Sequence, residues 1–247
     1  MITRQFITEL STKYQTSEQN IAREYCQHLF LSYLYRKKES ERLLFKGGTA
    51  LRIVFNSPRF SEDLDFSGYD FSIEQINSLV DSVLVDLDKE GINIQKKLNP
   101  ETGGETSGGY YATIILKLLE FDSEISIQIS LRSKEGLKNN TELVENDFVA
   151  PYVIVFLDES LLVREKVQAL LARAKPRDFF DLYFILRNRR LVVYIPQDMG
   201  DLKNRIIEVL QNGWEKELKI FLPVSYHPLL KDFRERLTRE IEIHVKD

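Results

Sequence analysis

Apolar side chains recur every three or four residues in the first part of the chain, between positions 6 and 36. Ala22, Tyr25 and Leu29 show this spacing, which places side chains on one face of an α-helix. A short apolar run over 43–45 follows and ends at a glycine pair, and the sequence TALRIVF after the pair has helical spacing again. The pattern therefore predicts a helical segment, a short strand, a turn and another helix.

The middle of the chain predicts mainly β-strands. In the stretch DLDFSG, Leu64 and Phe66 alternate with Asp63 and Asp65, and a period of two is typical of a strand with one buried face. An amphipathic helix is predicted over 71–87. Further apolar runs have strand character, and the glycine-rich segment between the first two is typical of a hairpin loop. These runs cover 92–98, 110–119, 125–132 and 149–157.

From residue 160 onward the pattern is helical to the end of the sequence. Pro176 separates the first two predicted helices, because proline lacks the backbone N–H and its ring clashes with the preceding turn. Three more helices are predicted after Pro196. We therefore expect an α+β fold with a domain over 1–157, followed by an all-helical domain over 158–247.

Composition narrows the class of protein. The 247 residues are 43% hydrophobic and 29% charged, which is ordinary for a globular protein of this size. The net charge of -4 argues against unspecific coating of nucleic acid, so a polyanionic partner would need a local basic patch. Cys26 is the only cysteine, which excludes an intrachain disulfide and a cysteine-based zinc site. No apolar run approaches the roughly 18 residues of a membrane span, and we expect a cytoplasmic protein.

The stretch FKGGTALRIVFNSPRFSEDLDF combines two features that suit a metal-bound phosphate. Gly47 and Gly48 allow the backbone to approach a ligand closely, and the N-terminus of the following helix presents free N–H groups to an anion. Asp63 and Asp65 lie two positions apart on a strand, hence on one side and about 6 to 7 Å from each other. Such a pair favours a cation between the carboxylates, and Mg²⁺ is held in this way while it also binds phosphate.

Each feature alone has a simpler explanation. A glycine pair is typical of a turn, and an Asp-x-Asp pair is typical of a solvated strand face. Their combination in a strand, turn, helix and strand frame favours a site for a metal-bound triphosphate. The motif is not a P-loop, because Lys46 precedes the glycines and no Gly-Lys-Ser/Thr follows them.

Four motifs in this order, KGGTALR, RFSEDLDF, REKVQALLAR and RDFFDLYFIL, resemble the successive motifs of the AbiEii/AbiGii toxin family of nucleotidyltransferases. The resemblance covers residues 43–187. It implies a polymerase-β-like nucleotidyltransferase domain with a mixed sheet and flanking helices, followed by a helical lobe. It also implies Mg²⁺ or Mn²⁺ as cofactor, a nucleoside triphosphate (NTP) as substrate, the 3′ end of tRNA or another RNA as acceptor, and a cognate antitoxin protein as partner. Neither DNA nor a membrane is expected as a partner.

The first two motifs carry the nucleotide and the metal in this resemblance. In the resemblance, Gly47, Gly48 and Thr49 correspond to the residues that hold the nucleotide phosphates. Asp63 and Asp65 correspond to the residues that bind the metal, and they are also the first catalytic candidates. Further nucleotide contacts are expected from the neighbouring residues Lys46, Arg59 and Ser61.

The last two motifs supply the remaining candidates. Lys166 corresponds to the lysine that contacts the triphosphate, and the Arg-Asp-x-x-Asp element corresponds to Arg177, Asp178 and Asp181. The resemblance thus implies catalytic roles for Lys166 and Asp178, and nucleotide contacts for Lys166, Arg177 and Asp181. From the residues alone, Asp178 either takes part in the reaction or pairs with a neighbouring arginine and orients it.

The segment 160–190 is the most basic part of the chain. It holds eight Lys or Arg and three Asp or Glu, a net charge of +5 in a chain of -4. Lys166 and Arg173 are seven positions apart and share a helix face. The segment either forms the local patch that a polyanion needs or consists of ordinary solvated helix faces.

One position departs from the pattern of many polymerase-β-like enzymes, which take a third carboxylate from a later strand. The corresponding sequence here is EISIQISLR, and Gln128 stands where that acid is expected. An amide cannot act as a base, so either two aspartates suffice, or a neighbour such as Glu124 or Asp178 helps, or the enzyme is slow.

The sequence therefore leaves three alternative functions. The first is a metal-dependent nucleotidyltransferase toxin that modifies RNA. The second has the same fold and chemistry but a small molecule or a protein as acceptor. The third is a nucleotide-binding module with little or no turnover, which the missing third acid favours.

Overall fold

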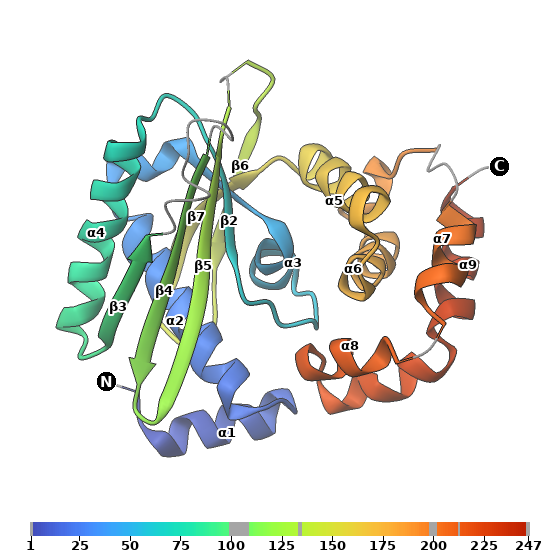
Figure 1. Ribbon diagram of the computed structural model, residues 1–247, viewed down its shortest axis with the longest axis horizontal. Coiled ribbons are helices and arrows are strands. Elements are labelled where there is room, and N and C mark those ends of the chain that lie inside the picture. The colour runs from blue at the N-terminus through green and yellow to red at the C-terminus, as the bar shows by residue number, and fades with distance from the viewer. Residues whose placement is uncertain (1, 99–108, 133–134, 198–201, 212, 246–247) are drawn as a thin grey trace. The chain divides into compact units, whose positions relative to one another are not determined.

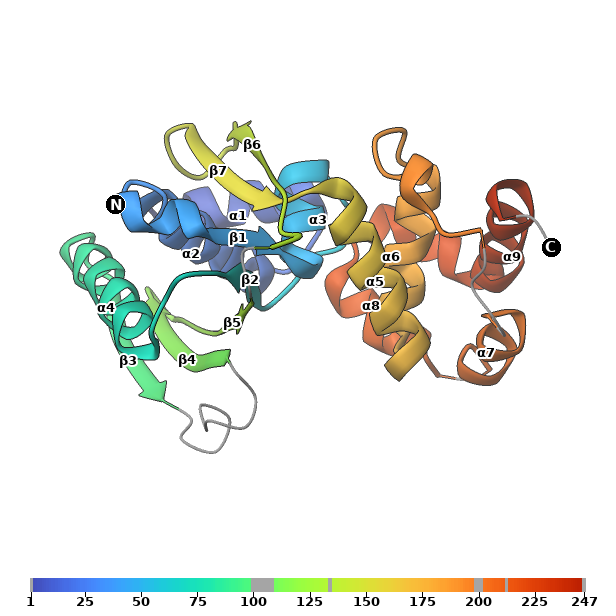
Figure 2. The same cartoon turned by 90° about the horizontal axis from the view of Figure 1, so that it is seen from above.

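The computed structural model describes residues 2–98, 109–132, 135–197, 202–211 and 213–245. The chain divides into two compact units (Figures 1 and 2). The first consists of Met1–Asn56 and Phe60–Leu157, and the second of Ser57–Arg59 and Asp158–Asp247. A three-residue segment from within the first half of the sequence therefore belongs to the C-terminal unit.

A mixed sheet of seven strands organises the first unit, with the strand order β3-β4-β5-β2-β1-β7-β6 (Figure 1). β1 pairs antiparallel with β2 and parallel with β7, and β2 pairs parallel with β5. This sheet, together with the helical C-terminal region, confirms the expected α+β fold class. The strands are β1 (Leu43–Lys46), β2 (Leu64–Gly68), β3 (Asn93–Leu98), β4 (Gly109–Leu118), β5 (Phe121–Leu131), β6 (Asn139–Val144) and β7 (Tyr152–Leu157).

Helices cover one face of this sheet, on which Phe45, Phe66 and Ile129 are buried. α2 lies behind the sheet in Figure 1 and contacts both α4 and β5. α3 packs on the same face, because the ring of Phe55 lies 5.6 Å from that of Phe156 between centroids. The helices of this unit are α1 (Arg4–Tyr14), α2 (Glu18–Leu34), η1 (Lys38–Arg42), α3 (Gly47–Phe55) and α4 (Ile73–Lys89).

Two predictions for this unit were wrong in detail. The helical segment expected over 6–36 is two helices, because Gln15 adopts a left-handed conformation and Ser17 caps α2 by accepting a bond from the Asn20 N–H. Strand β6 was missed, since its sequence NNTELV is too polar to stand out. The hairpin loop expected between β3 and β4 lies outside the described residues.

The second unit is helical, as expected. Pro176 is the first residue of α6, where its missing N–H has no helical partner to lose. Trp214 and Phe180 pack against Phe233 in the core of this unit. Its helices are α5 (Glu159–Arg173), α6 (Pro176–Arg187), η2 (Val192–Tyr194), α7 (Leu202–Val209), α8 (Glu215–Phe221), η3 (Val224–Asp232) and α9 (Phe233–His244). In the described part of the chain, no helix is both long and apolar enough to span a bilayer.

Candidate active site

The glycine turn between β1 and α3 is fitted to the carboxylate of Asp65. Gly47 has φ +84°, a conformation that side-chain-bearing residues rarely adopt. A Cβ atom at Gly47 would lie 2.1 Å from Asp65 Oδ2 and 2.9 Å from Asp65 Cβ. Only glycine therefore allows the aspartate to lie directly against the turn.

Sheet pairing brings these two motifs together. In the antiparallel register of β1 and β2, Lys46 lies opposite Asp65, so the residue that precedes the glycines is the cross-strand neighbour of the aspartate. Leu64 and Phe66 point into the core, and Asp65 is half-buried on the opposite face. Asp63 is also half-buried. The alternation predicts that Asp63 is part of the strand, but it lies one residue before β2.

The start of α3 retains groups that can bind an anion. Lys46 is the N-cap residue and makes no side-chain capping bond, and the first turn contains no acidic residue. Its backbone N–H groups and the positive end of the helix dipole suit a phosphate. The Thr49 hydroxyl is directed elsewhere, because it donates a hydrogen bond to the carbonyl of Asp63 and is 1% exposed.

Gln128 is the residue that β5 places beside Asp65. The two are directly paired in the parallel register of β2 and β5. Ile127 and Ile129 are buried and Gln128 is exposed, so the polar residues of β5 share the face of Asp65. The sheet therefore presents an amide at the position where a third carboxylate is expected.

Asp63 and Asp65 fit a hard divalent ion that takes most of its ligands from elsewhere. Among the residues that the structure describes, no group of three or more His, Cys, Asp and Glu side chains is arranged to hold a metal. Mg²⁺ needs only one or two carboxylates when water and substrate phosphates complete its octahedral shell. Because Gly47 has no Cβ atom, the Asp65 carboxylate can lie next to the turn, whose N–H groups can bind those phosphates.

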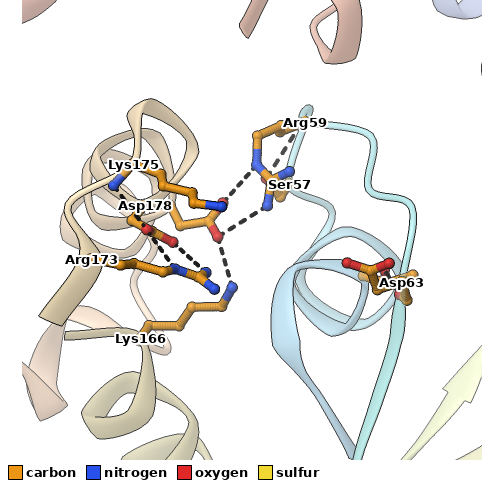
Figure 3. Close-up of polar contacts among 9 residues, drawn as sticks. Ser57, Arg59, Asp63, Lys166, Arg173, Lys175 and Asp178 are labelled. Atoms are coloured by element: carbon orange, nitrogen blue, oxygen red, sulfur yellow. Dashed lines mark hydrogen bonds and ion pairs between the residues drawn. The ribbon is translucent and has the colours of Figure 1, made fainter. Parts of the chain in front are cut away.

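In the second unit, Asp181 binds two candidate cations, Arg59 and Lys166, whose side chains are labelled in Figure 3. It accepts hydrogen bonds from Arg59 Nε at 2.8 Å and Nη2 at 3.0 Å, and from Lys166 Nζ at 2.8 Å. Burial raises the pKa of Asp181, but the positive charges of Arg59 and Lys166 outweigh burial and lower this pKa to about 2. The Asp181 carboxylate is thus ionised and saturated with donors.

Asp178 has a comparable set of partners near the start of α6 (Figure 3). Arg173 binds it with two parallel hydrogen bonds of 2.8 and 2.7 Å, and the backbone N–H of Lys175 donates to it at 3.1 Å. This is the arginine pairing that the sequence left open, with Arg173 as the partner. Asp178 is 2% exposed and caps the helix that carries Asp181.

Other candidates lie in varied environments. Lys46 is 9% exposed, and Ser61 and Arg177 are half-buried. In the basic segment 160–190, several cations pair with acids. Besides Lys166 and Arg173, these are Arg187 with Glu240 at 2.6 Å and Arg190 with Glu159 at 2.8 Å.

Sequence inspection missed Gln27 on α2. Its amide donates to the carbonyls of Ser61 and Glu62, next to Asp63. Gln27 occurs among the apolar residues of a buried helix and carries no motif, so the only signal was an amide in a stretch that is otherwise mostly core. Its partners lie more than thirty residues away and become visible only in the folded chain.

The comparison with protein families identifies the class. The model of the AbiEii nucleotidyl transferase toxin of type IV toxin–antitoxin systems matches residues 29–241. The chain belongs to this family and is a nucleotidyltransferase toxin, which confirms the resemblance found in its motifs. No curated protein matches the chain.

Solved structures share the fold. JHP933 from Helicobacter pylori superposes with a TM-score of 0.62 at 18% identity, covering 92% of each chain. MenT4, a nucleotidyltransferase toxin from Mycobacterium tuberculosis, superposes with a TM-score of 0.61 at 17% identity, covering 98% of this chain and 90% of that chain. At these identities the likeness establishes the common architecture.

Proposed function

We propose that this toxin transfers a nucleotide from an NTP to RNA, with Mg²⁺ or Mn²⁺ held by Asp63 and Asp65 and the 3′ end of tRNA as the acceptor. The observation that carries the proposal is the fit between the glycine turn and Asp65, where a Cβ at Gly47 would lie 2.1 Å from the carboxylate. Because the turn fits closely around the carboxylate, the proposed phosphate-binding turn lies directly beside the proposed metal ligand Asp65. An NTP is the substrate that this family uses.

The residues divide the chemistry among them. In nucleotidyl transfer an acceptor hydroxyl attacks the α-phosphorus, a new P–O bond forms, and the bond to pyrophosphate breaks. When bound, Mg²⁺ neutralises the phosphate charges in this reaction. Asp65 accepts the proton of the attacking hydroxyl, the N–H groups at Gly47 and Gly48 bind phosphate oxygens, and Lys166 neutralises the departing pyrophosphate.

Arg59 and Asp181 support Lys166 in this proposal. Asp181 bonds to both cations, and Arg59 and Asp181 are each under 5% exposed. A buried carboxylate with two cationic partners fixes the position of the lysine ammonium. Arg59 and Asp181 therefore act through Lys166, and Arg177 and Lys46 remain proposed contacts of the nucleotide.

Label transfer tests the activity. The purified protein and its Asp63→Asn, Asp65→Asn double variant are incubated with Mg²⁺, total tRNA and each labelled NTP in turn. We expect label on RNA from the wild type alone, with one nucleotide preferred. RNA labelled equally by the double variant would contradict the assignment of the two aspartates.

Gln128 favours a second candidate function, a module that binds NTP without turnover. It occupies the position paired with Asp65, and it cannot accept a proton as a carboxylate does. Calorimetry decides between the two candidates. Binding of NTP that requires Mg²⁺, with no product on RNA, protein or small molecules after hours, would favour the module.

The ion pairs of the basic segment 160–190 bear on the question of whether the acceptor is RNA. Lys166, Arg173, Arg187 and Arg190 each pair with an acid, which reduces the charge available to RNA. An RNA acceptor predicts affinity that falls steeply with salt, because phosphate contacts release counterions. A flat response would favour a small-molecule or protein acceptor.

Family membership also makes an antitoxin the proposed partner of the toxin in the cell. Expression of the wild type alone is expected to arrest growth, and co-expression of a neighbouring gene to restore it. Growth arrest by the Asp63→Asn, Asp65→Asn variant would show that toxicity does not depend on transfer.

A further inference from the structure

Two buried side chains hold the backbone that carries Asp63. Gln27 on α2 donates its Nε2 hydrogens to the carbonyls of Ser61 at 3.0 Å and Glu62 at 3.1 Å. Thr49 on α3 donates its hydroxyl to the carbonyl of Asp63. Three consecutive carbonyls are thus bound by side chains from two helices. We call Gln27 and Thr49 the carbonyl clamp.

The surroundings of the carbonyl clamp are dry and reinforced. Gln27 is 2% exposed and Thr49 is 1% exposed, and hydrogen bonds are stronger where water is excluded. Arg52, three positions after Thr49 on the same helix face, lies 4.0 Å from the ring centre of Phe60. Its guanidinium also binds Glu24 on α2 at 2.8 Å, which ties α3 to α2 beside the clamp.

Asp63 needs this support more than Asp65 does. Asp65 lies within β2, where register with Lys46 and Gln128 fixes its backbone on both sides. Asp63 precedes the strand and has no place in either ladder. The clamp therefore takes the place of strand pairing at the first of the two aspartates.

We infer that Gln27 and Thr49 are positioning residues that set metal affinity by fixing the carboxylate of Asp63. The inference rests on the proposed role of Asp63 as a metal ligand. A ligand held in place before binding loses less conformational freedom when the ion arrives, so the ion binds more tightly.

The same geometry gives Thr49 a role other than the phosphate contact that family resemblance implies. A hydroxyl has one proton, and the Thr49 proton is directed to the carbonyl of Asp63. Toward a phosphate it presents only oxygen lone pairs, which repel the anionic oxygens. Thr49 therefore acts on the metal through Asp63 and does not bind the triphosphate.

The experiment measures Mn²⁺ affinity directly, by electron paramagnetic resonance of free Mn²⁺ in the presence of a non-hydrolysable NTP analogue. Thr49→Val and Gln27→Leu keep shape and remove the donors. Each is expected to raise the Kd for Mn²⁺ by roughly five- to tenfold, the effect of one net hydrogen bond. Thr49→Ser keeps the hydroxyl and is expected to stay within about twofold of the wild type.

Gln19→Leu is the matched control. Gln19 is also on α2 and donates its amide to a backbone carbonyl, that of Asp122 at 2.8 Å, away from Asp63. We expect its Mn²⁺ affinity to equal that of the wild type. Thermal unfolding of each variant confirms that it is folded, and if Thr49→Val does not fold, Gln27→Leu tests the clamp by itself.

Steady-state rates separate the two roles of Thr49. A positioning role predicts that Thr49→Val lowers kcat and raises the Mg²⁺ requirement, while binding of the NTP analogue in EDTA is unchanged. Weaker analogue binding in EDTA with unchanged Mn²⁺ affinity would overturn the inference in favour of a phosphate contact. Unchanged Mn²⁺ affinity in both clamp variants would overturn it as well.

Asp63→Asn distinguishes failure of the clamp from failure of the proposed function. If this variant loses Mn²⁺ binding while the clamp variants retain it, only the clamp is wrong. If this variant binds Mn²⁺ like the wild type, Asp63 is not a metal ligand, and both the clamp and the proposed function are wrong.

Discussion

The chain contains two pairs of aspartates in different surroundings. Asp63 and Asp65 of the sheet unit are half-buried at the edge of a glycine turn. Asp178 and Asp181 of the helical unit are buried, and Arg173, Arg59 and Lys166 bind their oxygens directly. The first pair lies beside the turn that we propose binds phosphate, whereas cations of the helical unit bind the oxygens of the second pair.

The difference shows how burial limits the partners that a carboxylate pair can have. A buried carboxylate is stable only when cations or donors compensate its charge, and such partners occupy the lone pairs that a metal would need. Asp181 accepts three charge-assisted hydrogen bonds from two cations. A metal there would have to displace side chains that are themselves buried. The comparison therefore favours the sheet unit as the place of the proposed metal.

The largest expected effect separates the pairs by stability. Asp181→Asn removes the buried carboxylate charge that both Arg59 and Lys166 bind, and we expect the helical unit to lose about 3 to 5 kcal/mol. Urea unfolding followed by Trp214 fluorescence measures this loss, since Trp214 lies in the core of that unit. Asp65→Asn serves as the comparison and should change stability by less than about 1 kcal/mol. Equal losses in both variants would remove the distinction between the pairs.

Acid is expected to weaken the sheet unit at a higher pH than the helical unit. Burial, with a smaller contribution from the nearby Arg52 charge, lowers the pKa of His28 to about 3. Because the unfolded chain binds this proton near pH 6.5 and the folded chain does not, stability falls as the pH drops from about 6.5 toward 3, by about 2 kcal/mol at pH 5. For Asp181 the lowered pKa of about 2 means that its stabilisation persists above pH 4 and is lost only as the pH falls toward 2.

Hydrogen exchange on α2 and α6 at pH 8 and pH 5 measures this contrast. We expect protection of α2 to decrease at pH 5 while that of α6 is maintained. His28→Gln should remove the dependence of α2, and His227→Gln, in the helical unit, should not. Parallel loss of protection in both helices would contradict the separate origins of the two effects.

A methyl group at the glycine turn tests the fit between Gly47 and Asp65. Gly47→Ala places a side chain at φ +84° and drives the Asp65 carboxylate from its position. We expect a loss of about 1 kcal/mol in stability from the backbone and a fall of at least about tenfold in transfer. Gly136→Ala is the control, because Gly136 has φ +79° with nothing within 4 Å of its Cβ position. Similar activity in the two variants would mean that the close contact at Gly47 has no catalytic consequence.

The smallest effect concerns Asp178. Its partner Arg173 is 46% exposed, so solvent weakens the ion pair, and we expect Asp178→Asn to lower stability by about 1 kcal/mol. Transfer should change by no more than about threefold, since the other α6 aspartate, Asp181, still holds Lys166. A loss of transfer as large as that of Asp65→Asn, without loss of stability, would instead make Asp178 a catalytic residue.

Local patterns predicted much of the sheet unit. The strand, turn and helix around Gly47 were predicted because their signals lie within about a dozen residues. The position of Gln128 was predicted relative to the expected acid, but only the register of β2 and β5 shows which face it occupies. Strand β6 was missed because it is an edge strand whose polar side chains face solvent.

Contacts between distant residues were beyond the sequence. Arg59 and Asp181 are 122 residues apart, and no local pattern in the sequence indicates the ion pair between them. The bonds from Gln27 to the carbonyls near Asp63 span more than thirty residues, and a backbone carbonyl has no sequence signature. Charge spacing identified the candidate residues, and only the folded structure gives the burial and the partners of each.

Calorimetric titration of Mn²⁺ with a non-hydrolysable NTP analogue into the wild type, the Asp63→Asn, Asp65→Asn double variant and Asp178→Asn tests the central claim most directly. The account predicts metal-dependent binding to the wild type and to Asp178→Asn, and none to the double variant. Undiminished metal-dependent binding by the double variant would show that the metal lies elsewhere and that the glycine turn and the two aspartates do not form the active site.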